Sequence, residues 1–326
     1  MKLSRRHFTA AATVSLAMPS IARAATTELI VAEPLHGTGY LPLYVAMRQG
    51  FFEAEKVSVK LLTMESGSGH INAVLSGQAF AFIGGPEHNA YAKIKGAEIR
   101  AVANVVDRGN VYLVARPGVA VDPKDMAATL KGRTIAGGYL GGTPNSITRY
   151  IVGKAGLKPI EDVKILEING AAQLAALKAG QADFATVSEP TITQGIRAGI
   201  WGEPFYNVPK ELGPYAYSTL NVRKESIDTN KDAVAGFVRG VMRGLEFTYA
   251  NPDEAAKIAK ADFPTMNPDD LKATLTRTFA DELWSKKGLI SEQSWTTAKS
   301  VVMAAGLLKQ DVPYDAIIDM SFVANA

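Results

Sequence analysis

Short apolar runs alternate with helix-period segments through the first two thirds of the chain. The runs are four to eight residues long and lie between Gly, Pro and Ser residues, which is typical of buried strands, whereas apolar residues spaced three and four apart indicate helices. Strands are predicted over 28–32, 57–62, 79–83, 99–106, 111–115, 133–136, 163–168, 182–187 and 217–222. Helices are predicted over 41–48, 71–76, 89–95, 145–155, 171–179 and 191–198. This alternation predicts an α/β protein with two mostly parallel sheets flanked by helices.

The last third of the chain has only the helical pattern. One apolar stripe runs from Val234 to Leu245, and further helices are predicted over 252–261, 268–281 and 291–305. The α/β part also repeats itself, because Gly77-Gln78-Ala79 and Gly180-Gln181-Ala182 each stand between a helix and a strand. We therefore expect two similar lobes and a helical C-terminal part.

The composition excludes several classes of function. Of the 326 residues, 47% are hydrophobic and 21% are charged, and no run of 18 apolar residues offers a membrane span. The net charge is +3, but the first 24 residues hold four basic and no acidic residues, which leaves 31 basic against 32 acidic residues in the remainder. A near-neutral body gives no reason to expect a nucleic-acid partner. The lack of cysteine excludes disulfides, thiolate metal sites and a cysteine nucleophile.

The N-terminus has the pattern of an export signal. Arg5 and Arg6 precede a weakly apolar, acid-free stretch over 9–21, and Ala22-Arg23-Ala24 supplies small residues where signal peptidase cleaves. Paired arginines before such a stretch resemble a twin-arginine signal. We therefore predict a signal peptide over 1–24, cleavage after Ala24 and a mature protein in the periplasm.

A series of short motifs follows the order found in one family of transport proteins. The motifs are Tyr40-Leu41-Pro42-Leu43-Tyr44-Val45-Ala46, Gly50-Phe51-Phe52-Glu53, Gly77-Gln78-Ala79-Phe80-Ala81, Ala155-Gly156-Leu157-Lys158-Pro159, Gly180-Gln181-Ala182-Asp183 and Ser188-Glu189-Pro190. Over residues 27–260 the set resembles the periplasmic substrate-binding proteins of ABC importers for nitrate, sulfonates, taurine and thiamin-pyrimidine precursors, the NMT1/THI5-like family.

This resemblance implies the type II periplasmic-binding-protein fold, in which two lobes hold a ligand in the cleft between them. Lobe 1 would comprise 25–112 and 218–326, including the C-terminal helices, and lobe 2 would comprise 113–217. The hinge strands would lie near 111–115 and 217–222.

The position of the site can also be argued from the residues alone. Ligands of open α/β sheets bind beyond the carboxyl ends of the strands, where helices begin. Five loops in such positions are rich in Gly, Ser, Thr or Pro: 36–40, 66–70, 84–88, 138–145 and 188–190. Their free backbone N–H groups can bind a polar or anionic group. The candidate ligand-binding residues are His36, Thr38, Tyr40, Ser66, Ser68, Glu87, His88, Tyr139, Thr143, Asn145, Ser188 and Glu189.

Other interpretations of these residues stay open. Any single loop can be an ordinary cap or turn, although Thr143 followed by Pro144 is a strong helix start. His36, His70 and His88 could bind zinc, but donation to a ligand or capping is favoured, and neither a metal nor a cofactor is expected. Glu189 is expected to pair with a loop donor, whereas Glu87 facing the ligand would favour a donor-bearing molecule over a sulfonate.

The predicted function is that of a monomeric solute-binding component of an ABC-type importer. Its ligand would be a small organic molecule, such as a sulfonate, an aromatic carboxylate or a pyrimidine, delivered by hinge closure to a permease and its ATPase. One alternative is an enzyme related to thiamin-pyrimidine synthesis, but the family member with that activity needs a cysteine-rich segment that this chain lacks. The other alternative is a ligand-binding periplasmic sensor.

Overall fold

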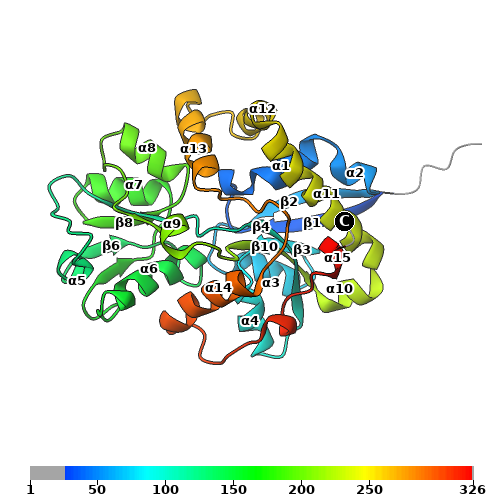
Figure 1. Ribbon diagram of the computed structural model, residues 1–326, viewed down its shortest axis with the longest axis horizontal. Coiled ribbons are helices and arrows are strands. Elements are labelled where there is room, and N and C mark those ends of the chain that lie inside the picture. Colours follow the sequence, from blue (N-terminus) through cyan, green and yellow to red (C-terminus); the bar gives the residue numbers. More distant parts are fainter. Residues whose placement is uncertain (1–25, 325–326) are drawn as a thin grey trace, which may run out of the picture.

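The computed structural model describes residues 26–324 and contains two α/β units, each built on a five-stranded sheet (Figure 1). The strand order is β2-β1-β3-β10-β4 in the first sheet and β7-β6-β8-β5-β9 in the second. The predicted signal peptide lies outside the described residues. Within the described residues, none of the helices is both long and apolar enough to span a membrane.

The first unit holds the N-terminal strands and one strand from later in the chain. Its strands are β1 (Thr27–Glu33), β2 (Val57–Thr63), β3 (Ala81–Gly84), β4 (Ile99–Val106) and β10 (Ser218–Arg223). Its helices between these strands are η1 (Thr38–Tyr40), α1 (Leu41–Arg48), α2 (Phe51–Ala54), α3 (Gly69–Leu75) and α4 (Glu87–Lys93).

The second unit is formed by the middle of the chain. Its strands are β5 (Tyr112–Ala115), β6 (Thr134–Ala136), β7 (Lys164–Leu166), β8 (Phe184–Val187) and β9 (Tyr206–Asn207). Its helices are α5 (Met126–Leu130), α6 (Thr143–Lys154), α7 (Ala171–Lys178), α8 (Thr191–Arg197) and α9 (Val208–Leu212). The nine predicted strands are confirmed to within a few residues, whereas β9 and the short helices α2, α5 and α9 carry too little periodicity to be predicted.

Both sheets are mixed but mostly parallel, as predicted: in each, four strands run in one direction and one strand is antiparallel to its two neighbours. In the first sheet, β2-β1-β3 are parallel, but β10 is antiparallel to both β3 and β4. In the second sheet, β7-β6-β8 are parallel, but β5 is antiparallel to both β8 and β9. The antiparallel strands β5 and β10 are those by which the chain enters a sheet after leaving the other unit.

The two units repeat one topology, which confirms the sequence repeat. Gly77 ends α3 before β3, and Gly180 ends α7 before β8, and both have positive φ, of 80° and 70°. Glycine tolerates this left-handed conformation after a helix without the strain that a Cβ would cause. The chain passes between the units through 107–111 and 213–217. These segments lead directly into β5 and β10, and the hinge near 111–115 and 217–222 stays a prediction.

The C-terminal helices cover the first unit and also reach the second (Figure 1). They are α10 (Lys224–Thr229), α11 (Lys231–Ala250), α12 (Pro252–Asp262), α13 (Pro268–Ala280), α14 (Glu292–Ala304), η2 (Tyr314–Ala316) and α15 (Ser321–Ala324). The apolar stripe of α11 packs against α1 and α2, whereas α13 contacts α8 and α14 contacts α6. Helices that the resemblance assigned to lobe 1 therefore also contact the second unit.

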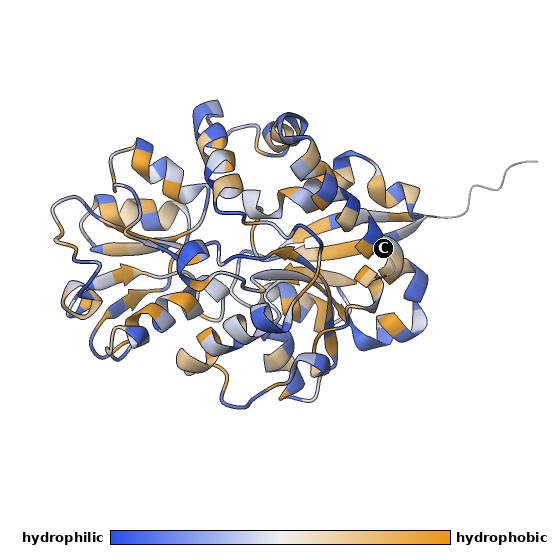
Figure 2. Cartoon of the chain, in the orientation of Figure 1, coloured by the Kyte–Doolittle hydropathy of each residue, from blue (hydrophilic) through white to orange (hydrophobic). Residues whose placement is uncertain are grey.

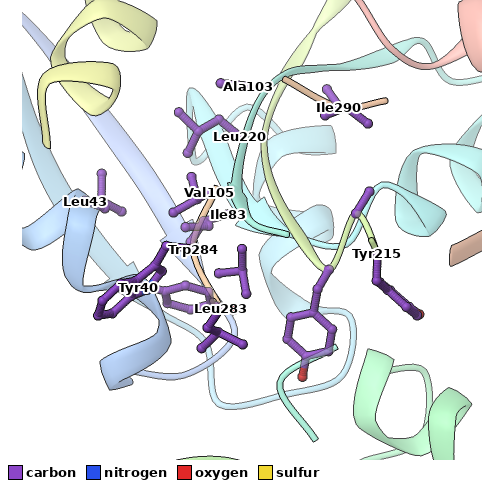
Figure 3. Close-up of a cluster of buried hydrophobic side chains, with 14 of the residues drawn as sticks. Tyr40, Leu43, Ile83, Ala103, Val105, Tyr215, Leu220, Leu283, Trp284 and Ile290 are labelled. Carbon is purple, nitrogen blue, oxygen red and sulfur yellow. The ribbon is translucent and has the colours of Figure 1, made fainter. Parts of the chain in front are cut away.

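Hydrophobic residues follow the strands of both sheets, and hydrophilic residues face outward on the surrounding helices (Figure 2). The largest buried cluster extends through both units, and Trp284, Tyr40, Leu43 and Leu283 all belong to it (Figure 3). The Trp284 indole Nε1 donates to the Gly39 carbonyl at 2.8 Å. The core thereby fixes the loop after β1, which contributes to the site.

Candidate functional site

The loops that follow the strands of both sheets surround one cavity of about 310 Å³. The first unit contributes the loops after β1, β2 and β3, and the second unit contributes those after β6, β7 and β8. Residues of all five loops proposed from the sequence line its wall. Asn110 and Tyr217, from the two segments that connect the units, complete it.

The structure brings eight of the twelve candidate residues to this cavity. They are His36, Tyr40, Ser66, His88, Tyr139, Thr143, Ser188 and Glu189. Thr38, Ser68, Glu87 and Asn145 do not line it. Thr38 and Glu87 are each 1% exposed, and Ser68 is an exposed residue at the N-cap position of α3 whose side chain makes no capping hydrogen bond. Asn145 is fully buried and has a structural role, because its Nδ2 donates to the Gly138 carbonyl at 3.1 Å.

Glu87 joins the two units below the cavity wall. Its Oε1 accepts a hydrogen bond of 2.5 Å from the Thr143 hydroxyl, which belongs to the first turn of α6 in the second unit. The neighbouring His88 also crosses between the units, because its Nε2 lies 3.2 Å from the Gly67 carbonyl and 3.1 Å from the Gly141 carbonyl. Its Nδ1 lies 3.0 Å from the Gly85 carbonyl. Glu87 therefore holds the units together, and its carboxylate does not face the ligand space.

The loops after β2 and β6 touch through their backbones at Gly67. A Cβ at this position would lie 2.1 Å from the Leu140 carbonyl oxygen and 2.9 Å from the Gly142 nitrogen. Contacts this short are sterically forbidden, so only glycine permits the two loops to approach to this distance. Together with the Glu87 and His88 contacts, this approach describes a closed arrangement of the two units.

The loop after β1 is held by the carboxylate of Glu33, which is fully buried. Glu33 accepts hydrogen bonds of 2.7 Å from both the Tyr44 and Thr63 hydroxyls, and the His36 Nδ1 lies 3.0 Å from its Oε1. This hydrogen bond to Glu33 raises the pKa of His36 above 6.5, against the opposing effect of burial. The His36 ring also stacks on Tyr44 at 4.6 Å between centroids. His36 is thus fixed at the cavity wall by groups behind it.

Glu189 connects the cavity wall to α13. Its Oε1 accepts from Arg277 Nε at 2.9 Å and from Thr193 at 2.8 Å, and its Oε2 accepts from Thr274 at 2.9 Å. Burial raises the pKa of Glu189, and these three donors oppose that effect. Arg277 also lies 3.1 Å from Glu203. Pairing with a donor was the expectation for Glu189, but the donors come mainly from a helix distant in sequence.

The candidate set omitted several residues of the wall, including His70, Asn110, Tyr217 and Ser218. His70 belongs to the 66–70 loop, so a signal for it was present in the sequence. Asn110 and Ser218 lie where the chain passes between the units, and they have no loop-and-helix pattern to mark them. The described residues contain no group of three or more His, Asp or Glu side chains placed to hold a metal.

Two α/β units of one topology, connected by two crossing segments and closed over a cavity, define the class of two-lobed periplasmic-binding-protein folds. The chain belongs to the NMT1/THI5-like family, whose model matches residues 38–255. This membership agrees with the resemblance drawn from the sequence.

Several known proteins of similar sequence or structure are binding proteins by name. The riboflavin-binding protein RibY of Chloroflexus aurantiacus is 27% identical over 303 residues, which cover 87% of this chain and 82% of RibY. The protein YtlA of Bacillus subtilis (strain 168) is 25% identical over 297 residues, which cover 90% of this chain and 88% of YtlA. The alkanesulfonate-binding protein SsuA from Xanthomonas axonopodis pv. citri, solved with MOPS bound, has a TM-score of 0.74 at 16% identity, covering 90% and 99% of the two chains.

Proposed function

We propose that this chain is the solute-binding component of an ABC-type importer, which captures a small organic molecule between its two lobes and delivers it to a membrane permease and its ATPase. The cavity carries this proposal, because loops from two separate sheets line it and contacts between those loops close over it. The lobes are the units predicted as 25–112 with 218–326 and as 113–217. Membership of the NMT1/THI5-like family supports the same function.

The mechanism is closure of the lobes around the ligand. A ligand that contacts both lobes binds the closed arrangement more tightly than the open one, so it shifts the population toward closure. Residues from each lobe that line the cavity, such as Tyr40 and His88 on one side and Thr143 and Ser188 on the other, are the proposed contacts. The permease then recognises the closed form.

The protein acts in the periplasm as a monomer, after removal of residues 1–24. Related structures whose names include periplasmic sulfonate-binding and nitrate-binding proteins support this location. The chain binds its ligand without converting it. Stoichiometric binding with no turnover separates this function from that of an enzyme, and permease and ATPase genes beside its own separate it from that of a sensor.

A thermal-shift screen of residues 25–326 tests the proposal. The panel contains alkanesulfonates, aromatic carboxylates, pyrimidines and riboflavin. A true ligand at a hundred times its dissociation constant adds about 2.7 kcal/mol to the free energy of unfolding, which is readily measured. A panel in which no compound raises the melting temperature, or in which a bound compound is consumed, would contradict the proposal.

A further inference from the structure

Two buried polar side chains of the cavity wall have hydrogen-bonding atoms with no partner in the described part of the chain. His70, at the start of α3, is 1% exposed, and neither of its ring nitrogens is hydrogen-bonded. Asn110, in the first connecting segment, is 6% exposed, and its Oδ1 has no donor. Buried polar groups in native proteins are almost always hydrogen-bonded. Both side chains line the cavity, so a molecule bound there can supply these bonds.

Packing, not hydrogen bonding, holds the His70 ring in place. It lies edge-on to Phe82 and to His88, with centroids 5.1 and 4.6 Å away. A Cβ on Gly84 would lie 2.9 Å from its Nε2, so this edge of the ring passes directly over the Gly84 backbone. Burial first, and then the neighbouring His88, lower the pKa of His70 well below 6.5. The ring is therefore neutral near pH 7, with one nitrogen that donates and one that accepts.

The surroundings of the cavity offer no uncommitted positive charge. Within residues 26–324, no lysine or arginine lines its wall. The cationic groups close to it are each engaged by a carboxylate: His36 with Glu33, and Arg277 with Glu189 and Glu203. His88 lies 4.0 Å from the Glu87 carboxylate and has carbonyl oxygens at both ring nitrogens.

Carboxylates lie near the beginnings of three of the helices around the cavity, α4, α6 and α8. The Glu87 carboxylate lies in the first turn of α4 and accepts from Thr143 in the first turn of α6. Glu189 lies two residues before α8 and accepts from the Thr193 hydroxyl within its first turn. These carboxylates place negative charge near the positive ends of the three helices, where a bound anion would otherwise be favoured. An anionic ligand would enter a site with buried carboxylates and no free cation.

We propose that the ligand is an uncharged polar molecule that exchanges hydrogen bonds with His70 and Asn110, and that His70 determines specificity for it. This inference rests on the proposed function and narrows its ligand class to uncharged amides or heterocycles, against the sulfonates and carboxylates. The wall also contains Tyr40, Tyr139 and Tyr217, whose rings suit a planar ligand. A ligand that cannot hydrogen-bond to the buried imidazole leaves the ring nitrogens of His70 without partners, which costs binding free energy. His70 therefore discriminates strongly between ligands that can and cannot form these bonds.

Matched pairs of probes that differ mainly in charge test this inference. We would titrate the protein with nicotinamide and nicotinate, with benzamide and benzenesulfonate, with riboflavin and riboflavin 5′-phosphate, and with MOPS alone. The uncharged member of at least one pair should bind, and its anionic counterpart should bind at least tenfold more weakly. His70→Phe should reduce affinity for that uncharged probe by about tenfold or more, whereas His70→Gln, which keeps a donor and an acceptor, should lose less.

Two controls separate binding from folding. Ligand-free His70→Phe should melt at the same temperature as the parent protein or a few degrees higher, about 2–4 °C, because the imidazole nitrogens have no protein partner to lose. Tyr206→Phe is the second control, because the Tyr206 hydroxyl also has no partner in the described chain but lies outside the cavity wall. This variant should bind the probe with unchanged affinity. Tighter binding of an anionic probe, or unchanged affinity in a folded His70→Phe protein, overturns the inference and leaves the proposed function standing. Failure of every probe to bind overturns the proposed function itself.

Discussion

The close approach of the two lobes at Gly67 makes Gly67→Ala a selective test of closure. The new Cβ would lie 2.1 Å from the Leu140 carbonyl oxygen, whereas carbon and oxygen atoms pack at about 3.3 Å or more. The facing loops must therefore separate by roughly 1.2 Å. Because Gly67 does not have positive φ, alanine is compatible with its backbone, and the clash is with the opposite lobe only. The substitution should disfavour the closed arrangement without unfolding either lobe.

The cost of this separation follows from the contacts beside Gly67. The Thr143–Glu87 hydrogen bond of 2.5 Å and the His88–Gly141 contact of 3.1 Å would both lengthen beyond bonding distance. A hydrogen bond to a charged group contributes about 1.5–3 kcal/mol. We therefore expect the closed arrangement to lose about 2–3 kcal/mol, which corresponds to roughly 30- to 150-fold weaker ligand binding.

Small-angle scattering and ligand titration measure this effect together. Gly67→Ala should have a larger radius of gyration than the parent protein, should compact less on adding the ligand found in the screen, and should bind it more weakly. Gly153→Ala is the matched control, because Gly153 lies within α6 with open space around its Cβ position. This control should bind normally and gain about 0.5–1 kcal/mol of stability. Parent-like affinity and dimensions in Gly67→Ala would refute the assignment of this contact to closure.

Four further changes give independent tests. Thr143→Val should weaken ligand binding because the hydrogen bond to Glu87 is lost. Thr143→Asp places a second carboxylate opposite that of Glu87, so it should also enlarge the radius of gyration. Equal binding by both variants and the parent would argue against a role of the Thr143–Glu87 bond in closure. Arg277→Gln leaves Glu189 with two hydroxyl donors. Because the Arg277 side chain is 22% exposed, we expect the free energy of unfolding in urea to fall by about 2 kcal/mol, less than the full cost of breaking a buried pair. Adding Glu189→Gln should recover part of that loss, and strict additivity would contradict the pairing. The folded-state pKa of His36 is raised, so its contribution to stability should be complete below pH 6.5 and should disappear as the pH rises through the raised pKa. In urea unfolding, His36→Gln should abolish this fall of the free energy of unfolding with pH. A fall like that of the parent protein would exclude His36 as its source. Replacing Arg5 and Arg6 by lysine should leave precursor in the cytoplasm, while N-terminal sequencing of the exported parent should begin at Ala25; normal export of the double variant would exclude a twin-arginine signal.

The sequence by itself determined the local elements and the order in which they repeat. Apolar periodicity depends on which residues face a buried surface, so it located the nine main strands and the long helices to within a few residues. Gly77 and Gly180 marked equivalent helix ends in the two lobes because a left-handed residue after a helix is a local requirement. The five loops of the cavity wall were found for a similar reason, since a turn before a helix has its own composition.

Only the tertiary structure decided strand direction, lobe contacts and the roles of buried charges. The insertion of β10 between β3 and β4 depends on pairing across more than a hundred residues, so the local pattern could not identify the one antiparallel strand of the mostly parallel sheet. Glu87 bonds to Thr143 and Glu189 to Arg277, although nothing in the sequence near either carboxylate names its partner. Asn110 reaches the cavity because the chain crosses between the lobes there. These contacts join residues that are distant in the chain. Their energies depend on the distances between the interacting atoms and on the burial of the side chains, which only the folded structure determines.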